Sequence, residues 1–105
     1  MIGYMRLGLN VIFDKNISIA IDFAKKNKFS CIEFWIAAPQ FYIEKFSKKE
    51  RKKILTLSQS KGIDLQIHAP ENLSLFIDYL GVREAMLAYY KNLIDFAKDI
   101  GAVTI

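Results

Sequence analysis

The feature that most constrains the fold is a sequence pattern that occurs three times in the 105-residue chain: a helix-like stretch, a turn residue, then a short apolar stretch. The helical ends at residues 24–28, 58–62 and 97–101 lead into predicted strands at residues 31–36, 63–68 and 102–105. An opening strand is predicted at residues 6–11, which gives four strands alternating with three helices. This alternation predicts an α/β fold with parallel strands joined by helical crossovers.

Each repeat ends its helix with a residue type that tolerates a positive φ angle, and we expect a left-handed cap at each: Asn27, Gly62 and Gly101. The second helix is predicted to open with a capping box, because Ser47 is followed three residues later by Glu50. The third helix carries an apolar stripe at helical spacing, which we assign to the core: Val82, Met86, Tyr89, Leu93, Ala97 and Ile100.

Three connections follow the carboxyl ends of the predicted strands, where parallel α/β folds bind their ligands. They cover residues 12–15, 37–46 and 69–80. The second and third are longer than the roughly two to six residues that are usual for such connections. Their length predicts a functional rim at this end of the sheet.

Parallel strands that are covered on both faces usually read as continuous apolar runs, but the predicted strands of this chain alternate. One parity is apolar: Leu7, Leu9, Val11, Ile32, Phe34, Ile36, Leu65 and Ile67. The other parity is mostly polar: Arg6, Gly8, Asn10, Cys31, Glu33, Trp35, Asp64, Gln66 and His68. Successive side chains of a strand point to opposite faces. We therefore expect helices on the apolar face, and the polar face suits the lumen of a barrel.

The residues of the polar face fall into two groups, one at the starting ends of the strands and one, the candidate site, at their finishing ends. Arg6 and Asp64 lie at the starting ends of their strands, where an ion pair is predicted because unpaired buried charges are costly. The candidate site consists of the polar-face residues at or near the finishing ends of the strands: Asn10, Glu33, Trp35 and His68.

The residue types leave more than one role open at this site. His68, the only histidine, is either a hydrogen-bonded structural residue or a metal or catalytic group, since one neutral ring nitrogen can bind a divalent metal. Glu33 is a second metal ligand, a general base or a carboxylate paired to Arg6. Trp35 is a stacking wall for a sugar or a base, or a packing residue of the lumen.

Charge and composition limit the partners and the compartment. Lys and Arg number 15 against 11 Asp and Glu, a net charge of +4, and much of the excess gathers at the start of the second helix. Such a run is ordinarily a solvated face, so nucleic acid is the less favoured partner. No apolar run reaches the roughly 18 residues of a membrane span, and no signal-cleavage pattern follows the N-terminus. The lone Cys31 indicates a reducing compartment, so we expect a cytoplasmic chain without a membrane partner.

Several stretches resemble the xylose-isomerase-like TIM barrels, the superfamily of sugar and sugar-phosphate isomerases, epimerases and endonuclease IV. Residues 5–10 are similar to the first strand of these barrels. Residues 29–35 resemble the second-strand phrase, in which a glutamate follows a branched apolar residue. Residues 67–70, Ile-His-Ala-Pro, with two leucines soon after, resemble the third-strand motif of the endonuclease-IV-like branch, and residues 81–84 with the helix after them continue the likeness.

The resemblance implies metal-dependent chemistry in the parent barrel, with zinc, manganese or magnesium as the cofactor. His68 matches the third-strand histidine that binds one of the divalent metals in the endonuclease-IV-like members. Glu33 is then the expected catalytic residue, and Asn10 and Trp35 are the expected contacts to a sugar-type substrate. The family's later ligands have no counterpart in this chain, so we expect these 105 residues to be inactive alone.

An eight-stranded barrel takes about 250 residues, so residues 1–105 are expected to form a single partial domain, the N-terminal half of a TIM-barrel-like fold. Four strands leave two open sheet edges, which predicts a homo-oligomer assembled through those edges. The favoured function is a part of a metal-dependent sugar or sugar-phosphate isomerase or epimerase. The alternatives are a part of an endonuclease-IV-like nuclease acting on abasic DNA, and a non-catalytic half-barrel that acts by self-association.

Overall fold

The computed structural model describes residues 5–12 and 16–105. Its strands are β1 (Gly8–Val11), β2 (Cys31–Trp35) and β3 (Asp64–His68), and its helices are α1 (Ile17–Lys26), α2 (Lys48–Lys61) and α3 (Leu80–Ile100). Two short 3₁₀ turns, Pro39–Phe41 and Ile43–Lys45, lie between β2 and α2. The strands are parallel and lie in the order β1-β2-β3. This is the predicted α/β arrangement, although most of the predicted connection at residues 12–15 lies outside the described residues.

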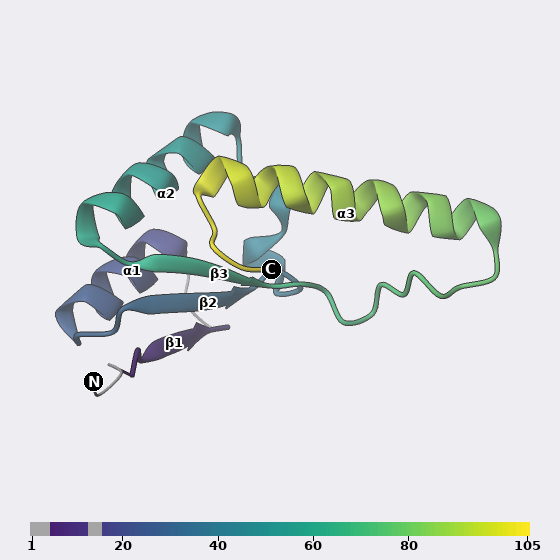
Figure 1. Cartoon of the computed structure of the whole chain (residues 1–105). Helices are drawn as coiled ribbons and strands as arrows, with labels where there is room; N and C mark the ends of the chain where they lie inside the picture. Colours follow the sequence, from purple (N-terminus) through teal and green to yellow (C-terminus); the bar gives the residue numbers. More distant parts are fainter. Residues whose placement is uncertain (1–4, 13–15) are drawn as a thin grey trace.

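The helices cover one face of the sheet, as Figure 1 shows. The register places Gly8 opposite Cys31 and Cys31 opposite Asp64, so equivalent residues of the three strands share a face. The apolar parity of β2 and β3 is buried under the helices: Ile32, Phe34, Leu65 and Ile67. The Phe34 ring packs edge-on against those of Phe41 and Phe96, at centroid distances of 5.8 and 6.4 Å. The predicted division into an apolar and a polar face is therefore confirmed for these two strands.

Leu7 is an exception to the predicted apolar face. The strand begins at Gly8 instead of Arg6, and the Leu7 side chain is 59% exposed. Its carbonyl accepts a hydrogen bond from the Ser30 amide at 2.9 Å. The backbone of Leu7 thus belongs to the sheet region, while its side chain lies beyond the helices that would bury it.

The predicted fourth strand at residues 102–105 is a single parallel bridge between Gln66 and Thr104 in the structure. Two backbone hydrogen bonds hold it beside β3: Ile67 N donates to Thr104 O at 3.0 Å, and Val103 N donates to Leu65 O at 2.8 Å. The reason for the short pairing is local. Gly101 and Ala102 turn the chain out of α3 and bond back to it, so pairing with β3 begins at Val103.

Two of the three predicted left-handed caps are present. Gly62 has φ 65° and Gly101 has φ 72°, and the amides at and after each glycine bond back to the last turn of α2 or α3. Asn27 was the wrong residue, since its φ is −97°. The positive φ lies at Lys28 (62°), whose amide and that of Phe29 make the same pair of bonds to α1. The Asn27 side chain instead donates to the Phe23 carbonyl at 2.8 Å.

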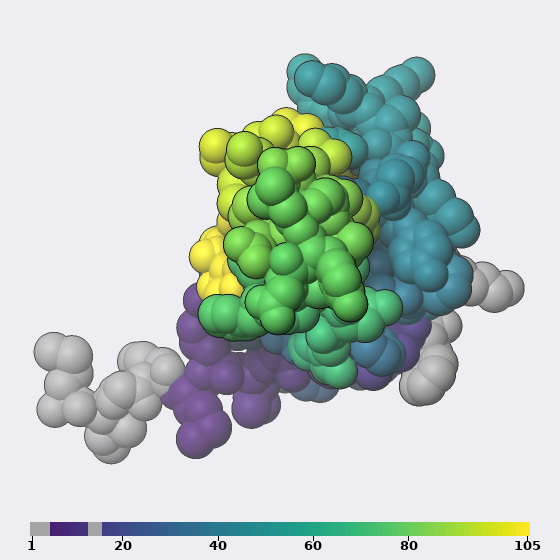
Figure 2. Space-filling view, turned by 90° about the vertical axis from the view of Figure 1, so that its right-hand side faces the viewer, coloured from purple at the N-terminus to yellow at the C-terminus, as the bar shows by residue number. Residues whose placement is uncertain are grey.

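The predicted stripe of α3 is buried only in its carboxyl-terminal half. Leu93, Ala97 and Ile100 lie in the core, but Val82 is 43% exposed. Figure 1 shows why: α3 continues well past the carboxyl ends of the strands, and the connection at residues 69–79 runs back along it. Figure 2, which looks at this end of the molecule, shows the connection and the start of α3 standing in front of the remaining structure.

Two hydrogen bonds tie this long connection to α3. The Tyr90 hydroxyl donates to Leu73 O at 3.0 Å, and Arg83 Nε donates to Ile77 O at 2.9 Å. The connection is therefore hydrogen-bonded to α3 beyond the carboxyl end of the sheet. Within the described ranges, 5–12 and 16–105, no helix is both long enough and apolar enough to cross a membrane.

Candidate functional site

The floor of the polar face holds the predicted ion pair. Arg6 Nη2 lies 2.6 Å from Asp64 Oδ2 and also donates to the Ser30 carbonyl at 3.2 Å. The hydrogen bond and charge of Asp64 raise the pKa of Arg6. Since Arg6 binds Asp64, the pairing of Glu33 with Arg6 that the residue types left open is not the arrangement found.

Glu33 is bound by Asn10 instead. The register aligns Asn10 with Glu33 and Glu33 with Gln66, and Asn10 Nδ2 donates to Glu33 Oε1 at 3.4 Å. Three polar side chains from three strands therefore form one row across the face that carries no helix. An amide that donates to one carboxylate oxygen leaves the second oxygen able to accept a further hydrogen bond.

Trp35 and His68 form the next row, at the carboxyl ends of β2 and β3. They are register partners, and their ring centroids lie 6.0 Å apart at an interplanar angle of 73°. The indole Nε1 of Trp35 is buried, and it is the one buried side-chain nitrogen or oxygen in the described part of the chain that has no hydrogen-bond partner. A buried donor left unpaired costs about 1–3 kcal/mol. The indole N–H therefore has neither a protein acceptor nor an exposed surface in the described structure.

His68 is oriented by the backbone. Its Nδ1 lies 2.9 Å from the carbonyl oxygen of Ala69, and because a carbonyl only accepts, this contact assigns the proton to Nδ1. The other ring nitrogen, Nε2, lies 3.4 Å from Glu71 Oε1, a contact that is an ion pair when the imidazole carries both protons. An imidazole held in this way is the usual arrangement of a metal-binding histidine.

Glu71 lies beside His68, although no role was predicted for it from the sequence. The available signal was its position, three residues after the only histidine and at the carboxyl end of a strand. No group of three or more His, Cys, Asp and Glu side chains that could hold a metal occurs among residues 5–12 and 16–105. Catalytic zinc takes about three protein ligands, so His68 and Glu71 fit a divalent metal only as part of a larger ligand set.

The basic residues lie elsewhere on the molecule. The lysines in the first half of α2 are exposed, and α2 covers the face of the sheet opposite the Asn10–Glu33 row, as can be followed in Figure 1. Arg51 is turned inward, where Nη1 lies 3.0 Å from Asp99 Oδ2 and the guanidinium lies 5.0 Å from the centre of the Phe96 ring. The charge of this helix is thus partly structural and does not line the polar face.

Comparisons with known proteins give matches among solved structures alone. No family model and no curated protein matches the chain. One similar structure is a D-psicose 3-epimerase crystallised in the presence of D-fructose, with a TM-score of 0.79 and 18% identity over 93% of this chain and 35% of that chain. Another is the probable 3-DHS dehydratase AsbF, involved in petrobactin synthesis, from Bacillus anthracis, with a TM-score of 0.68 and 19% identity over 93% of this chain and 36% of that chain.

Both likenesses extend over nearly all of this chain, which spans about a third of the length of either solved protein. At these identities the likeness concerns the fold. The parallel βα units, the helices on one face and the polar row on the other agree with it. The chain has the fold of part of a TIM barrel.

Proposed function

We propose that this chain is part of a metal-dependent sugar or sugar-phosphate isomerase or epimerase, and that it supplies substrate and metal contacts on the polar face of the sheet. The observation that carries the proposal is the Trp35–His68 ring pair at the carboxyl ends of β2 and β3, which lies one row above the Asn10–Glu33 hydrogen bond on the face without helices. An indole ring offers an apolar surface to a sugar, and the Asn10 and Glu33 side chains offer polar groups to its hydroxyls.

The side chains of the chain take distinct parts in this proposal. Asn10 and Trp35 bind and orient the sugar. Glu33 is the proton-transferring carboxylate, held in place by the Asn10 amide, because a general base must be fixed within hydrogen-bond reach of the proton it moves. His68, with Glu71 beside it, is a ligand to zinc, manganese or magnesium. When bound, such a metal polarises a substrate carbonyl. The further ligands and the remaining strands belong to a complete barrel, so turnover is assigned to that barrel.

Sugar binding can be tested on the isolated chain because Trp35 is its only tryptophan. D-Fructose, in whose presence one similar protein was crystallised, is expected to shift the Trp35 indole N–H signal saturably in a ¹H–¹⁵N NMR titration. Asn10→Ala is expected to weaken this binding at least tenfold. Asn92→Ala, a change of the same type on the exposed surface of α3, is the control and should leave it unchanged. An indole signal that does not respond would overturn the proposed site.

Metal binding has its own readout, since His68 is the only histidine. Zn²⁺ is expected to shift the His68 ring signals, and Mn²⁺ to broaden them first among the side chains. Glu71→Gln should weaken Zn²⁺ binding several-fold, while Glu84→Gln on the exposed face of α3 should not. Equal effects of the two substitutions would contradict the assignment of Glu71. Salt-sensitive binding to abasic DNA, with no response to sugar, would favour the nuclease alternative instead.

We also propose that the chain associates with a second copy through its sheet edges. In the described residues β1 pairs only with β2, and the outer edge of β3 carries only the bridge to Thr104. Unpaired strand edges expose backbone donors and acceptors that a further strand can satisfy. Leu7 and Val103 add exposed apolar side chains near the two edges. The unpaired Cys31 supports a reducing compartment such as the cytoplasm.

A further inference from the structure

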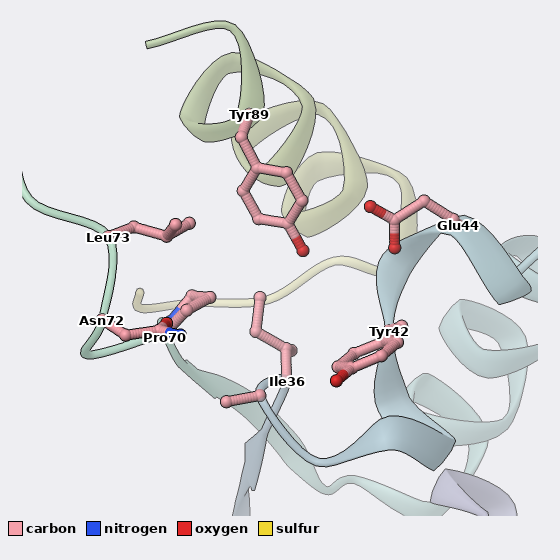
Figure 3. Close-up of a pocket in the computed structure, with 8 residues that line it drawn as sticks. Ile36, Tyr42, Glu44, Pro70, Asn72, Leu73 and Tyr89 are labelled. Atoms are coloured by element: carbon pink, nitrogen blue, oxygen red, sulfur yellow. The ribbon is translucent and has the colours of Figure 1, made fainter. Parts of the chain in front are cut away.

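A second concavity lies on the other side of β2 from the Asn10–Glu33 row. Its volume is about 280 Å³, and it is bordered by the end of β2, the connections that follow β2 and β3, and the exposed half of α3 (Figure 3). Ile36, which has the helix-facing parity of Ile32 and Phe34, forms its floor. Pro70 and Leu73 form an apolar wall. We call this concavity the tyrosine pocket.

Three polar groups point into the tyrosine pocket. Figure 3 shows the Tyr89 hydroxyl directed into it from α3, with the Glu44 carboxylate and the Tyr42 ring on the opposite side. Within the described residues, none of these three groups makes a hydrogen bond through its side-chain oxygens. Burial, followed by the charge of Glu44 and by Tyr42, raises the pKa of Tyr89. The Tyr89 hydroxyl therefore stays protonated and can act as donor or acceptor.

The wall of this pocket is held by the backbone of the long connection. The Tyr90 hydroxyl donates a hydrogen bond to Leu73 O at 3.0 Å. This bond holds the backbone of Leu73 next to α3. The volume lies near the lower limit of about 300 Å³ for small-molecule sites. The pocket is thus large enough for a compact ligand of one ring and a short chain.

The chemistry of the lining selects a positively charged ligand. Glu44 brings a carboxylate, and no Lys or Arg lines the pocket to neutralise it. The Lys45 ammonium lies over the Tyr42 ring, 5.8 Å from its centroid, so Glu44 and the Tyr89 hydroxyl carry the selection for charge. The Glu44 carboxylate favours an ammonium group, and the Tyr89 hydroxyl oxygen can accept a hydrogen bond from it. The apolar floor favours a ligand whose remaining part is hydrocarbon.

We infer that the tyrosine pocket is a binding site for a small organic ammonium compound. The ammonium group lies between the Glu44 carboxylate and the Tyr89 hydroxyl, and the apolar body lies on Ile36 against Pro70 and Leu73. This site is separate from the polar face, because Ile36 and the residues of the Asn10–Glu33 row point to opposite sides of the sheet. It therefore does not depend on the proposed function.

The test uses 2-phenylethylammonium and the neutral 2-phenylethanol, which share their ring and chain and differ in charge. A ¹H–¹⁵N NMR titration of the whole chain is expected to shift the amides of Ala37 and Leu73, with at least tenfold tighter binding of the ammonium compound. Glu44→Gln is expected to reduce this preference to less than threefold. Tyr89→Phe should weaken ammonium binding about threefold, and Glu84→Gln, an exposed glutamate of α3 outside the pocket, should have no effect.

Three outcomes would overturn the inference. They are equal affinity for the amine and the alcohol, a preference that survives in Glu44→Gln, and amide shifts that spread over the polar face instead of the pocket. Far-ultraviolet circular dichroism of each variant checks that it is folded. Since Glu44 is exposed and contributes no hydrogen bond to another described residue, Glu44→Gln is expected to keep the fold.

Discussion

At the scale of single residues, the end of α1 shows how little the residue type decides when the backbone geometry is set by the elements on either side. All three helices end with the same pair of backbone hydrogen bonds, which requires a positive φ angle just after the helix. Glycine holds that position after α2 and α3. After α1 it is held by Lys28, with φ 62°, although the better suited Asn27 stands one residue earlier.

Lys28→Gly is expected to stabilise the chain. A side chain in the left-handed region destabilises the folded state by about 1–2 kcal/mol, which glycine avoids. Glycine also gives the unfolded chain more conformational freedom, which offsets about 0.5–1 kcal/mol of that stabilisation. Urea unfolding should therefore show a net increase in the free energy of unfolding of roughly 0.5–1 kcal/mol.

Asn27→Gly is the matched control, because φ at Asn27 is −97° and its side chain bonds to the Phe23 carbonyl. It should lower the stability, since it removes that bond and gains nothing in backbone strain. A stabilising Asn27→Gly, or a destabilising Lys28→Gly, would contradict this account of the α1 terminus.

At the scale of elements, α2 and α3 begin in different ways. α2 starts with the predicted capping box, in which Ser47 Oγ accepts from the Glu50 amide at 3.3 Å and the Glu50 carboxylate accepts from the Ser47 amide at 2.7 Å. α3 starts after Tyr79, which makes no side-chain cap, and its first turns are held by the connection before it. The start of α2 is therefore set locally, while that of α3 depends on tertiary contacts.

The capping box predicts a pH dependence of stability. Hydrogen bonds from Ser47 lower the pKa of Glu50 below its ordinary value of 4.5. A lowered folded-state pKa stabilises the fold above pH 4.5, and that contribution is lost as the pH falls through the lowered pKa. Thermal melts between pH 6 and pH 2.5 should show this loss in the wild type. Glu50→Gln should melt lower at pH 6 and lose less on acidification.

Ser47→Ala tests the other half of the box. It is expected to cost about 1 kcal/mol at pH 6 and to remove most of the acid-dependent difference between the wild type and Glu50→Gln. Ser60→Ala, near the end of the same helix, is the control for a serine that caps nothing at the start of α2. If Ser47→Ala loses as much stability on acidification as the wild type, the capping box is not the cause of that loss.

At the scale of the whole molecule, the sheet has helices on one side and a polar face on the other, with β1 and β3 at its margins (Figure 1). A parallel sheet of three strands is an unusual final state, because such sheets are normally covered on both faces. In the solved structures of similar fold, the matched portion is about a third of a longer chain. The proposed self-association brings further strands to these margins.

The proposed self-association predicts a concentration-dependent mass. Light scattering after size exclusion should give 12.1 kDa at high dilution and a rise towards twice that mass as the concentration increases. Leu7→Lys combined with Val103→Lys should keep the chain at 12.1 kDa, because lysine at a strand edge opposes pairing. Leu87→Lys, at an exposed leucine of α3 away from the sheet, is the control. A mass of 12.1 kDa at every concentration for the wild type would contradict the proposal.

Much of the candidate site could be predicted from the sequence because a strand repeats every two residues. The alternation alone assigned Asn10 and Glu33 to the polar face, and the register of β1 with β2 brings them together. The contact of Glu71 with His68 could not be predicted in this way, since it depends on the turn after β3. The proposed metal and sugar roles of these residues remain predictions for the experiments above.

The sequence by itself determined the order of elements, the two faces of the sheet and the caps of α2, because each follows from periodicity or from contacts within about one helical turn. Tertiary structure alone decided how far residues 102–105 pair with β3, which half of the α3 stripe is buried, and that Tyr89 faces Glu44 across a pocket. The physical reason is that burial and long-range pairing depend on where an element ends relative to its neighbours. A local sequence pattern does not specify where an element ends relative to neighbours that are distant in the sequence.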